Sequence, residues 1–386
     1  VKERFVTLVP NRKGDWLNQR NSNFDDLIQL GNKKTNDSLF LDYTGGLKTG
    51  RDAWSWGFSR VDVEQKMKNS INYYNNHLGD KNVYSLETDA LSWTRSLKQR
   101  FERCEKQIYD DQRMYIGMYR PFTKKYIYYA QAWVDMQYKM PSVLPVSNSK
   151  NQMISLSNKT EGKKFTSLMV NVLPDINLFA GGSQNVPELL YDAMGSFSAI
   201  RPEVLKKLAG LNQSNIMYYL YGVFHSPQYE KIYGRDLAKS FPRVPNLKNK
   251  QGFIQIGCRL AELHLNYENQ PIWEGVEVEI SKPDYRVKKM KHPKKGILDT
   301  IIFNDSITIK NIPEKAYEYI VNGRSAIEWI IDQYQVKTDR KSGITDDPNE
   351  FSDDPKYILN LLLSVITVSM RTLELIDELP EFEVQE

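Results

Sequence analysis

The spacing of the apolar residues changes several times along the chain, and this change constrains the fold most. Residues 114–192 hold short apolar runs of strand length separated by Gly, Pro and Asn, whereas residues 203–267 repeat apolar side chains at helical spacing. Residues 276–309 return to strand-like runs, and residues 325–379 are helical again. Strands and helices in separate blocks are typical of α+β proteins. The sequence therefore predicts an α+β fold with mixed β-sheets flanked by helices.

The same pattern places individual strands. We expect strands at residues 5–9, 39–41, 114–119, 126–129, 153–156, 167–170, 176–179, 276–280, 297–303 and 307–309. Residues 276–280 alternate strictly between apolar and acidic side chains, which predicts a half-buried strand whose acids face water. The two runs at 297–303 and 307–309 are expected to join the same sheet.

Helices are expected at residues 59–78, 88–108, 213–224, 253–265, 325–334 and 356–379. Ser59 is a candidate N-cap because its hydroxyl can accept a hydrogen bond from the first helical turn. Ser226-Pro227 is expected to end one helix and begin the next, since proline restricts the residue before it. Residues 337–354 are rich in Asp and Glu, and we expect a solvated loop there that joins the last two helices.

The length of 386 residues allows one large domain or two ordinary ones. We expect a division into residues 1–112, an N-terminal part with a helical spacer or arm, and residues 113–386, an α+β core with C-terminal helices. The chain opens on Val1 rather than methionine, which suggests a piece of a larger protein.

The sequence offers few residues that could form a disulfide or bind a metal, and few apolar runs that could span a membrane. Cys104 and Cys258 cannot form a disulfide framework or a four-cysteine zinc site, which fits a reducing cytosol. The four histidines are far apart and show no metal-ligand spacing. Polar residues interrupt the most apolar stretch, 357–370, before it reaches the roughly 20 residues of a membrane span. We expect a cytoplasmic protein with neither a metal site nor a membrane partner.

Three segments approach catalytic motifs without completing them. Residues 45–52 have the glycine spacing of a phosphate-binding loop, but Arg51 and Asp52 replace its lysine and its hydroxyl residue. The adjacent histidine and serine at 225–226 do not face each other on a helix, and residues 354–356 are typical of a helix start with proline at its first position. The chain also lacks the Asn/Asp-Pro-Pro-Tyr/Phe tetrapeptide with which amino-methyltransferases hold a flipped base. We therefore predict no catalytic residue.

Positive charge is concentrated in a few stretches, although the net charge is only +4. The densest stretch is 282–295, and Lys and Arg at this density favour phosphate contacts and counterion release. Arginine can also read guanine bidentately in the major groove. The predicted DNA contacts are Arg12, Lys13, Arg20, Lys48, Arg51, Lys124, Lys125, Arg286, Lys288, Lys289 and Lys291. Because the excess charge is small, these side chains would have to gather on one face.

Structural explanations remain open for the same stretches. A solvated hairpin or loop accounts for 282–295 equally well, and an Arg–Asp pair within each turn accounts equally well for 11–20 and 48–54. Lys124 and Lys125 are expected to be exposed at a turn between two strands, with the aromatic residues around them in the core.

Several motifs resemble the C-terminal specificity region of type ISP restriction–modification enzymes. They are residues 18–21 (NQRN), 48–54 (KTGRDAW), 119–122 (YRPF), 221–229 (YGVFHSPQY), 241–245 (FPRVP), 260–268 (LAELHLNYE) and 329–334 (WIIDQY). The motifs occur in one order along nearly the whole chain, which makes the set far more specific than any one of them.

In that family one polypeptide joins a nuclease, a helicase-like ATPase, an adenine methyltransferase and a C-terminal target-recognition domain. The resemblance implies that this chain is the last part alone, a module that recognises a specific duplex DNA sequence and carries no cofactor. Its partners would be DNA and the methyltransferase and helicase domains of the same polypeptide. S-adenosylmethionine, ATP and magnesium are implied only for the full-length parent, a restriction endonuclease and adenine-specific methyltransferase. The alternatives are a protein-interaction or spacer module that docks those domains, and a stand-alone enzyme.

Overall fold

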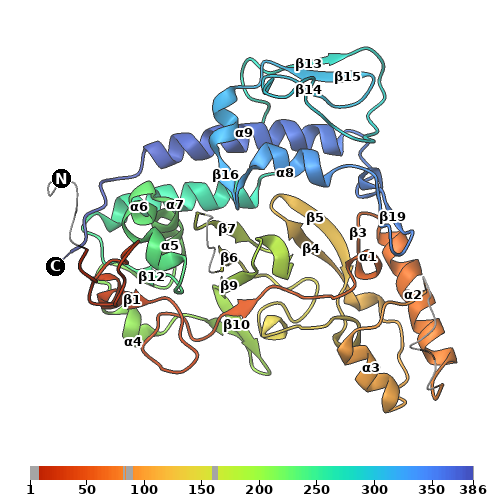
Figure 1. Ribbon diagram of the computed structural model, residues 1–386, viewed down its shortest axis with the longest axis horizontal. Helices are drawn as coiled ribbons and strands as arrows, with labels where there is room; N and C mark the ends of the chain where they lie inside the picture. Colours follow the sequence, from red (N-terminus) through yellow and green to blue (C-terminus); the bar gives the residue numbers. More distant parts are fainter. Residues whose placement is uncertain (1–7, 81–82, 84–89, 159–163, 386) are drawn as a thin grey trace.

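Helices and sheets occupy separate layers in the computed structural model, which describes residues 8–80, 83, 90–158 and 164–385 (Figure 1). The helices are α1 (Asp52–Ser55), α2 (Arg60–Asn76), α3 (Arg95–Glu102), α4 (Pro202–Leu205), α5 (Ile216–His225), α6 (Pro227–Leu237), α7 (Lys250–Leu265), α8 (Ala326–Gln333) and α9 (Tyr357–Asp377). Helices α5 to α9 run along one side of the central sheets, and α2 and α3 lie at one end. The predicted α+β class is confirmed.

Two four-stranded sheets form the centre. The strand orders are β2–β9–β6–β7, antiparallel throughout, and β3–β5–β4–β8, in which β8 runs parallel to β4. Their strands are β2 (Thr44–Gly45), β3 (Trp56–Gly57), β4 (Met114–Arg120), β5 (Thr123–Tyr128), β6 (Met153–Ser157), β7 (Ser167–Val170), β8 (Leu173–Pro174) and β9 (Ser183–Pro187). The second sheet is therefore mixed, as the sequence predicts.

Smaller sheets surround this centre. A three-stranded sheet, β13–β15–β14, lies on the outer side of α9, and four two-stranded ribbons pair β1 with β12, β10 with β11, β16 with β17 and β18 with β19. These strands are β1 (Ile28–Gln29), β10 (Leu189–Asp192), β11 (Gly195–Ser198), β12 (Arg243–Val244), β13 (Glu277–Ile280), β14 (Ile301–Ile302), β15 (Ile307–Lys310), β16 (Ile320–Val321), β17 (Arg324–Ser325), β18 (Lys337–Thr338) and β19 (Thr345–Asp346).

The N-terminal segment is woven into later parts of the chain. β1, β2 and β3 each pair with a strand that follows residue 112, namely β12, β9 and β5. A separate hydrophobic cluster joins α2 and α3 to the end of the β4–β5 pair through Tyr74, Phe101, Tyr128 and Trp133. The division at residue 112 stays a prediction, and the contacts across it are extensive.

Side-chain caps explain where several helices begin. Ser59 accepts a hydrogen bond from the Asp62 amide at the start of α2, as predicted. Ser325 and Glu328 form a reciprocal capping box at the start of α8. Ser226 lies between α5 and α6, and α6 begins at Pro227. The predicted break between these two helices is confirmed.

Some predicted elements differ from the structure. Residues 176–178 form a 3-10 turn instead of a strand, because the Asp175 side chain accepts a hydrogen bond from the Asn177 amide. Only residues 95–102 of the helix expected at 88–108 are helical, although part of the remainder lies outside the described residues. Residues 39–41 form isolated bridges at Phe40, and the expected strand 5–9 falls largely outside the described residues.

Helices α5 and α7 cross at close range through two glycines. A Cβ on Gly257 would lie 1.9 Å from the carbonyl oxygen of Tyr218, and a Cβ on Gly222 would lie 2.3 Å from that of Phe253. Helices approach this closely only where a side chain is missing at the crossing point. The two glycines therefore fix the distance between α5 and α7.

Helix α9 is long and apolar enough to cross a membrane by length and composition alone, although its apolar stretch was predicted to be too short. In the structure, 67% of its most apolar stretch is buried. It packs against α7 and α8, so its apolar face belongs to the core.

A buried polar cluster joins α5, α7 and α9. The Nδ1 atom of His264 lies 2.5 Å from the Tyr221 hydroxyl, and its Nε2 atom lies 2.9 Å from Thr372 Oγ1. The His225 ring lies 5.5 Å from the His264 ring, and its Nδ1 donates to the Tyr221 carbonyl. Burial lowers the pKa of His225 to about 4 and holds the pKa of His264 well below its usual value. Both rings are therefore neutral in the folded protein at pH 7.

This cluster predicts a loss of stability in mild acid. In the unfolded chain a histidine binds a proton near pH 6.5, whereas the folded His225 does so only near pH 4. Unfolding therefore takes up protons, and stability falls as the pH drops below 6.5. We expect His225→Asn to reduce the loss between pH 7.5 and pH 5 by about 2 kcal/mol relative to the wild type.

Urea denaturation at several pH values measures the unfolding free energy of the variant and of the wild type. The contributions of groups that titrate equally in both proteins cancel when the two are subtracted. The matched control is His77→Asn, which alters the histidine that follows α2, outside the cluster. An equal reduction in both variants would contradict the assignment to the buried pair.

Candidate nucleic-acid interface

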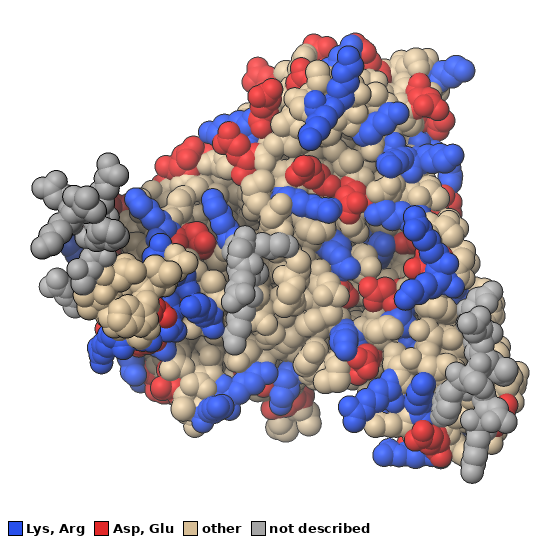
Figure 2. Space-filling view, viewed as in Figure 1, with Lys and Arg blue, Asp and Glu red and all other residues tan. Residues whose placement is uncertain are grey.

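A cleft of about 580 Å³ opens between the β3–β5–β4 sheet and the β18–β19 hairpin. Trp56, Phe58 and Tyr119 line it with aromatic rings, and its charged lining includes Arg120 and Lys125 together with the carboxylates of Asp52, Asp339 and Asp346. In the view of Figure 2, Lys and Arg side chains gather over the hairpin and around the hollow beside it, at the right of the molecule. The cleft thus combines aromatic surface with a cationic rim.

The root of the hairpin is fixed by one carboxylate. Asp346 accepts a hydrogen bond from the Phe58 amide at 2.8 Å and an ion-paired hydrogen bond from Lys125 Nζ at 2.7 Å. Lys125 lies between two rings, with its Nζ 4.4 Å from the centroids of both Phe58 and Tyr119. Burial lowers the pKa of Lys125, and the carboxylate of Asp346 opposes that effect. The hairpin is therefore joined to the sheet by a largely buried ion pair.

The tip of the hairpin is rigid and cationic. The Asp339 carboxylate accepts hydrogen bonds from the Lys341 amide and the Ser342 amide and hydroxyl, which closes the turn. Arg340 and Lys341 are exposed at this turn. Within the described part of the chain neither has an ion-pair partner. Both charges are available to an external anion.

The basic run 286–291 lies alongside the same hairpin. The Val336 amide, just before β18, donates to the Lys288 carbonyl at 3.0 Å. Beyond β19, Arg286 pairs with Asp347 at 2.7 Å. These contacts hold the run against both strands at the root of the hairpin. Lys288, Lys289 and Lys291 are exposed and have no ion-pair partner among the described residues.

Arg120 is also held by a carboxylate and an aromatic ring. Its Nη1 atom lies 2.9 Å from Asp175 Oδ1, and its guanidinium lies 3.9 Å from the centre of the Tyr119 ring. Burial raises the pKa of Asp175 to about 7, and the charge of Arg120 acts in the opposite direction. In the adjoining turn, Phe122 adopts a left-handed backbone conformation, which is strained for a residue with a side chain. Its ring is fully buried against Tyr267, and this packing offsets the backbone strain. The turn thus gives Arg120 a fixed direction.

The family model of the type ISP C-terminal specificity domain matches residues 38–361. The chain belongs to this family. The match covers the cleft, the hairpin and the basic run. The resemblance drawn from the sequence motifs is thereby confirmed.

Solved structures agree with the specificity-domain assignment. The ATP-dependent type ISP restriction–modification enzyme LlaBIII, bound to DNA, is 69% identical over 100% of this chain with a TM-score of 0.95. A nuclease-deletion mutant of the type ISP enzyme LlaGI, in complex with a DNA substrate mimic, is 50% identical over 98% of this chain with a TM-score of 0.89. DrdV, in a DNA complex, shares the fold at 24% identity over 99% of this chain, with a TM-score of 0.84.

The specificity domain is a small part of those proteins. It spans 26% of the LlaBIII chain, 30% of the LlaGI chain and 41% of the DrdV chain. No curated protein sequence matches the chain.

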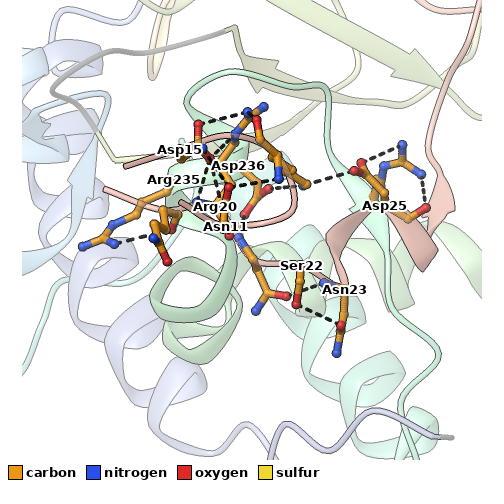
Figure 3. Close-up of polar contacts among 12 residues, drawn as sticks. Asn11, Asp15, Arg20, Ser22, Asn23, Asp25, Arg235 and Asp236 are labelled. Atoms are coloured by element: carbon orange, nitrogen blue, oxygen red, sulfur yellow. Dashed lines mark hydrogen bonds and ion pairs between the residues drawn. The ribbon is translucent and has the colours of Figure 1, made fainter. Parts of the chain in front are cut away.

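The specificity-domain structure separates the predicted DNA contacts into groups. Lys125, Arg286, Lys288, Lys289 and Lys291 lie at the cleft, along the hairpin or in the run beside it. Lys13 pairs with Asp236 of α6, and Arg20 donates to the Lys13 carbonyl, so these two predicted contacts and the adjoining Arg12 belong to the loop beside α6, at the opposite end of the molecule (Figures 1 and 3). The first group lies together beside the cleft and the second group lies elsewhere, and the DNA contacts of both groups stay predictions.

Three of the predicted contacts are largely buried, although Lys124 and Lys125 were expected to be exposed. Arg51 is only 3% exposed; it donates to Thr94 Oγ1 and lies over the Trp133 ring, and burial lowers its pKa to about 9. Lys124 and Lys125 are largely buried rather than exposed, because they pair with Glu268 and Asp346. Burial and pairing leave little free charge on Arg51 and Lys124, and their contact with DNA stays a prediction.

Most of the remaining predicted cations also form ion pairs with carboxylates. Lys48 pairs with Asp135 at 2.7 Å. Arg20 pairs with Asp15 within its own turn, as one alternative proposed, and its hydrogen bonds hold the pKa of Asp15 well below the usual value. Arg12 is exposed without an ion-pair partner in the described part of the chain, so its contact with DNA stays a prediction.

Sequence reasoning missed the cationic hairpin. Residues 337–354 were expected to be a solvated acidic loop, but Asp346 and Asp347 are paired with Lys125 and Arg286. The useful signal was a turn sequence, Asp339 to Gly343, with two adjacent cations at its centre. The specificity domain also contains no group of three or more His, Cys, Asp or Glu arranged to hold a metal ion, among the residues described.

Proposed function

We propose that this specificity domain recognises a particular duplex DNA sequence on behalf of a longer type ISP restriction–modification enzyme. The observation that carries the proposal is the meeting of two exposed cationic stretches beside the aromatic cleft. Lys288 and its neighbours come from the basic run, and Arg340 and Lys341 come from the hairpin, whereas Arg120 and Lys125 of the β4–β5 pair are already paired with Asp175 and Asp346. The DNA complexes of LlaBIII and LlaGI support this assignment.

The shape of the hairpin suits the proposed task. The major groove of B-DNA admits a two-stranded β-ribbon, and β18–β19 is such a ribbon with Arg340 and Lys341 at its turn. Contacts with phosphates position a protein on DNA, and contacts with base edges determine specificity. We assign the phosphate contacts to Lys288, Lys289 and Lys291, and a base-reading contact to Arg340.

We further propose that the chemistry resides elsewhere in the parent polypeptide. The nuclease, the helicase-like ATPase and the adenine methyltransferase would precede this domain and would use magnesium, ATP and S-adenosylmethionine. The specificity domain would present an adenine to the methyltransferase, which would flip it out of the duplex. The whole enzyme would act in the bacterial cytoplasm.

Charge reversal in the basic run tests the proposal. We expect Lys288→Glu/Lys289→Glu/Lys291→Glu to weaken binding to all duplexes by about 10- to 100-fold at low salt, because three phosphate contacts are lost. The slope of log affinity against log salt should fall by up to about 3. Fluorescence anisotropy at several salt concentrations measures both quantities.

The matched control reverses three exposed lysines at the other end of the molecule, Lys206, Lys207 and Lys231. That variant has the same net charge but should bind nearly as well as the wild type. Unchanged affinity and salt slope in the first variant would reject the basic run. Absence of DNA binding by the wild type would favour a spacer module instead.

A further inference from the structure

An exposed apolar loop lies at the end of the molecule opposite the cleft. Leu8, Val9, Trp16 and Leu17 are 53%, 67%, 59% and 70% exposed. Ile232 of α6, also exposed, lies close by, since Arg235 one turn further along α6 donates to the Gln19 carbonyl. We call Leu8, Val9, Trp16, Leu17 and Ile232 the apolar loop patch. Exposed apolar side chains that gather in one place mark interaction surfaces more often than single scattered ones do.

The loop that carries the patch is held rigidly, as Figure 3 shows. Asn11 Oδ1 accepts from the Lys13 and Asp15 amides, and Asn11 Nδ2 donates to the Arg20 carbonyl at 2.9 Å. The Arg20 side chain closes the loop through Asp15. Such cross-links hold Trp16 and Leu17 in place in spite of their exposure.

A buried carboxylate anchors the loop to α6. Asp236 is fully buried and accepts from Lys13 Nζ and from the Asn21 amide, both at 2.8 Å. Removing a buried carboxylate from water is costly unless it is fully paired. This anchor therefore has a definite geometry, and the patch is formed before any partner arrives.

We propose that the apolar loop patch docks the specificity domain onto the part of the same polypeptide that precedes it. This inference rests on the proposal that the domain works within a longer enzyme, and it does not depend on DNA reading. The family is by description a C-terminal domain, and this chain spans only 26% and 30% of the LlaBIII and LlaGI chains. The preceding part is therefore the partner that is tethered closest to residue 8.

The side chains of the apolar loop patch favour a protein partner over DNA. Lys13 and Arg20 are already paired with Asp236, Asp25 and Asp15, so they offer little charge to phosphates. Tryptophan and arginine, here Trp16 and the nearby Arg235, are enriched in protein interfaces. The position far from the cleft leaves the cationic hairpin free for its own partner.

Hydroxyl-radical footprinting with mass spectrometry tests the docking. The oxidation rate of Trp16 is compared in the 386-residue chain and in the longer enzyme. We expect it to fall at least about fivefold in the longer enzyme, since residues at the centre of an interface lose nearly all their exposed area. Met194, 95% exposed at the tip of the β10–β11 hairpin, is the internal control.

A second variant separates docking from folding. Trp16→Ser/Leu17→Ser should leave the thermal stability and DNA affinity of the 386-residue chain unchanged, because both side chains are exposed and far from the cleft. In the longer enzyme it should accelerate proteolysis at the junction before this domain.

Three outcomes would overturn the proposal. One is equal reactivity of Trp16 in both proteins. Another is protection in the 386-residue chain that rises with concentration, which would indicate a second copy. The third is protection on adding duplex DNA alone. Failure of DNA recognition would show only in the charge-reversal experiment, so the two proposals fail separately.

Discussion

A Gly257→Ala variant is expected to lose at least about 3 kcal/mol of unfolding free energy, or to fail to fold. The new Cβ would lie 1.9 Å from the Tyr218 carbonyl oxygen, and neither atom belongs to a flexible side chain. The helices α5 and α7 would have to separate, which would open the core around them. Alanine gains about 1 kcal/mol in helix propensity, too little to offset this loss.

Gly234→Ala in α6 is the matched control for this prediction. Its nearest contact would be the end of the Glu230 side chain at 2.9 Å, which is not backbone and can shift more easily than a helix. We therefore expect a much smaller effect there than at Gly257. Urea denaturation followed by tryptophan fluorescence gives both values, and similar stability of the two variants would disprove the close helix contact.

The second large effect is expected at the root of the hairpin. Asp346→Asn keeps an acceptor for the Phe58 amide but removes the negative charge that balances Lys125. Breaking one partner of a buried pair typically costs about 3 to 5 kcal/mol, because the other charge is left in the interior. We expect a loss of about 3 kcal/mol, near the lower limit, since Asp346 is partly exposed.

A double variant shows whether charge is the cause. Lys125→Met/Asp346→Asn removes the stranded cation and fills its place between Phe58 and Tyr119 with an apolar chain. We expect this variant to be more stable than Asp346→Asn alone, which gives a favourable coupling energy in a double-mutant cycle. Additive losses would mean that Lys125 and Asp346 act independently.

Local signals in the sequence predicted the regular elements well. Ser59 and Ser325 mark helix starts because a hydroxyl at that position satisfies free amides, whatever the rest of the fold does. The runs at 153–156 and 167–170 became β6 and β7, since β-branched and apolar residues between turns have few alternatives. The acids of 276–280 face water as expected, although Ile280 at the strand end is also exposed.

The candidate site was harder to predict, because its charges depend on contacts between distant residues. Whether Lys125 is free or paired is decided by Asp346, more than 200 residues later. Arg51 looks like a ligand-binding cation in its glycine-rich turn, but Thr94 and Trp133 enclose it in the fold. A single sequence reveals the number of charges in each stretch and leaves their partners undetermined.

The pairing of β1 with β12 affects how the protein is made. During synthesis Ile28 leaves the ribosome long before its partner, Val244, and Trp56 must likewise wait for Ile127. Contacts between such distant residues form slowly, because a long loop has to close first. The nascent chain therefore carries unpaired strand edges until much of the domain has emerged, and its early segments depend on the translation of the later ones.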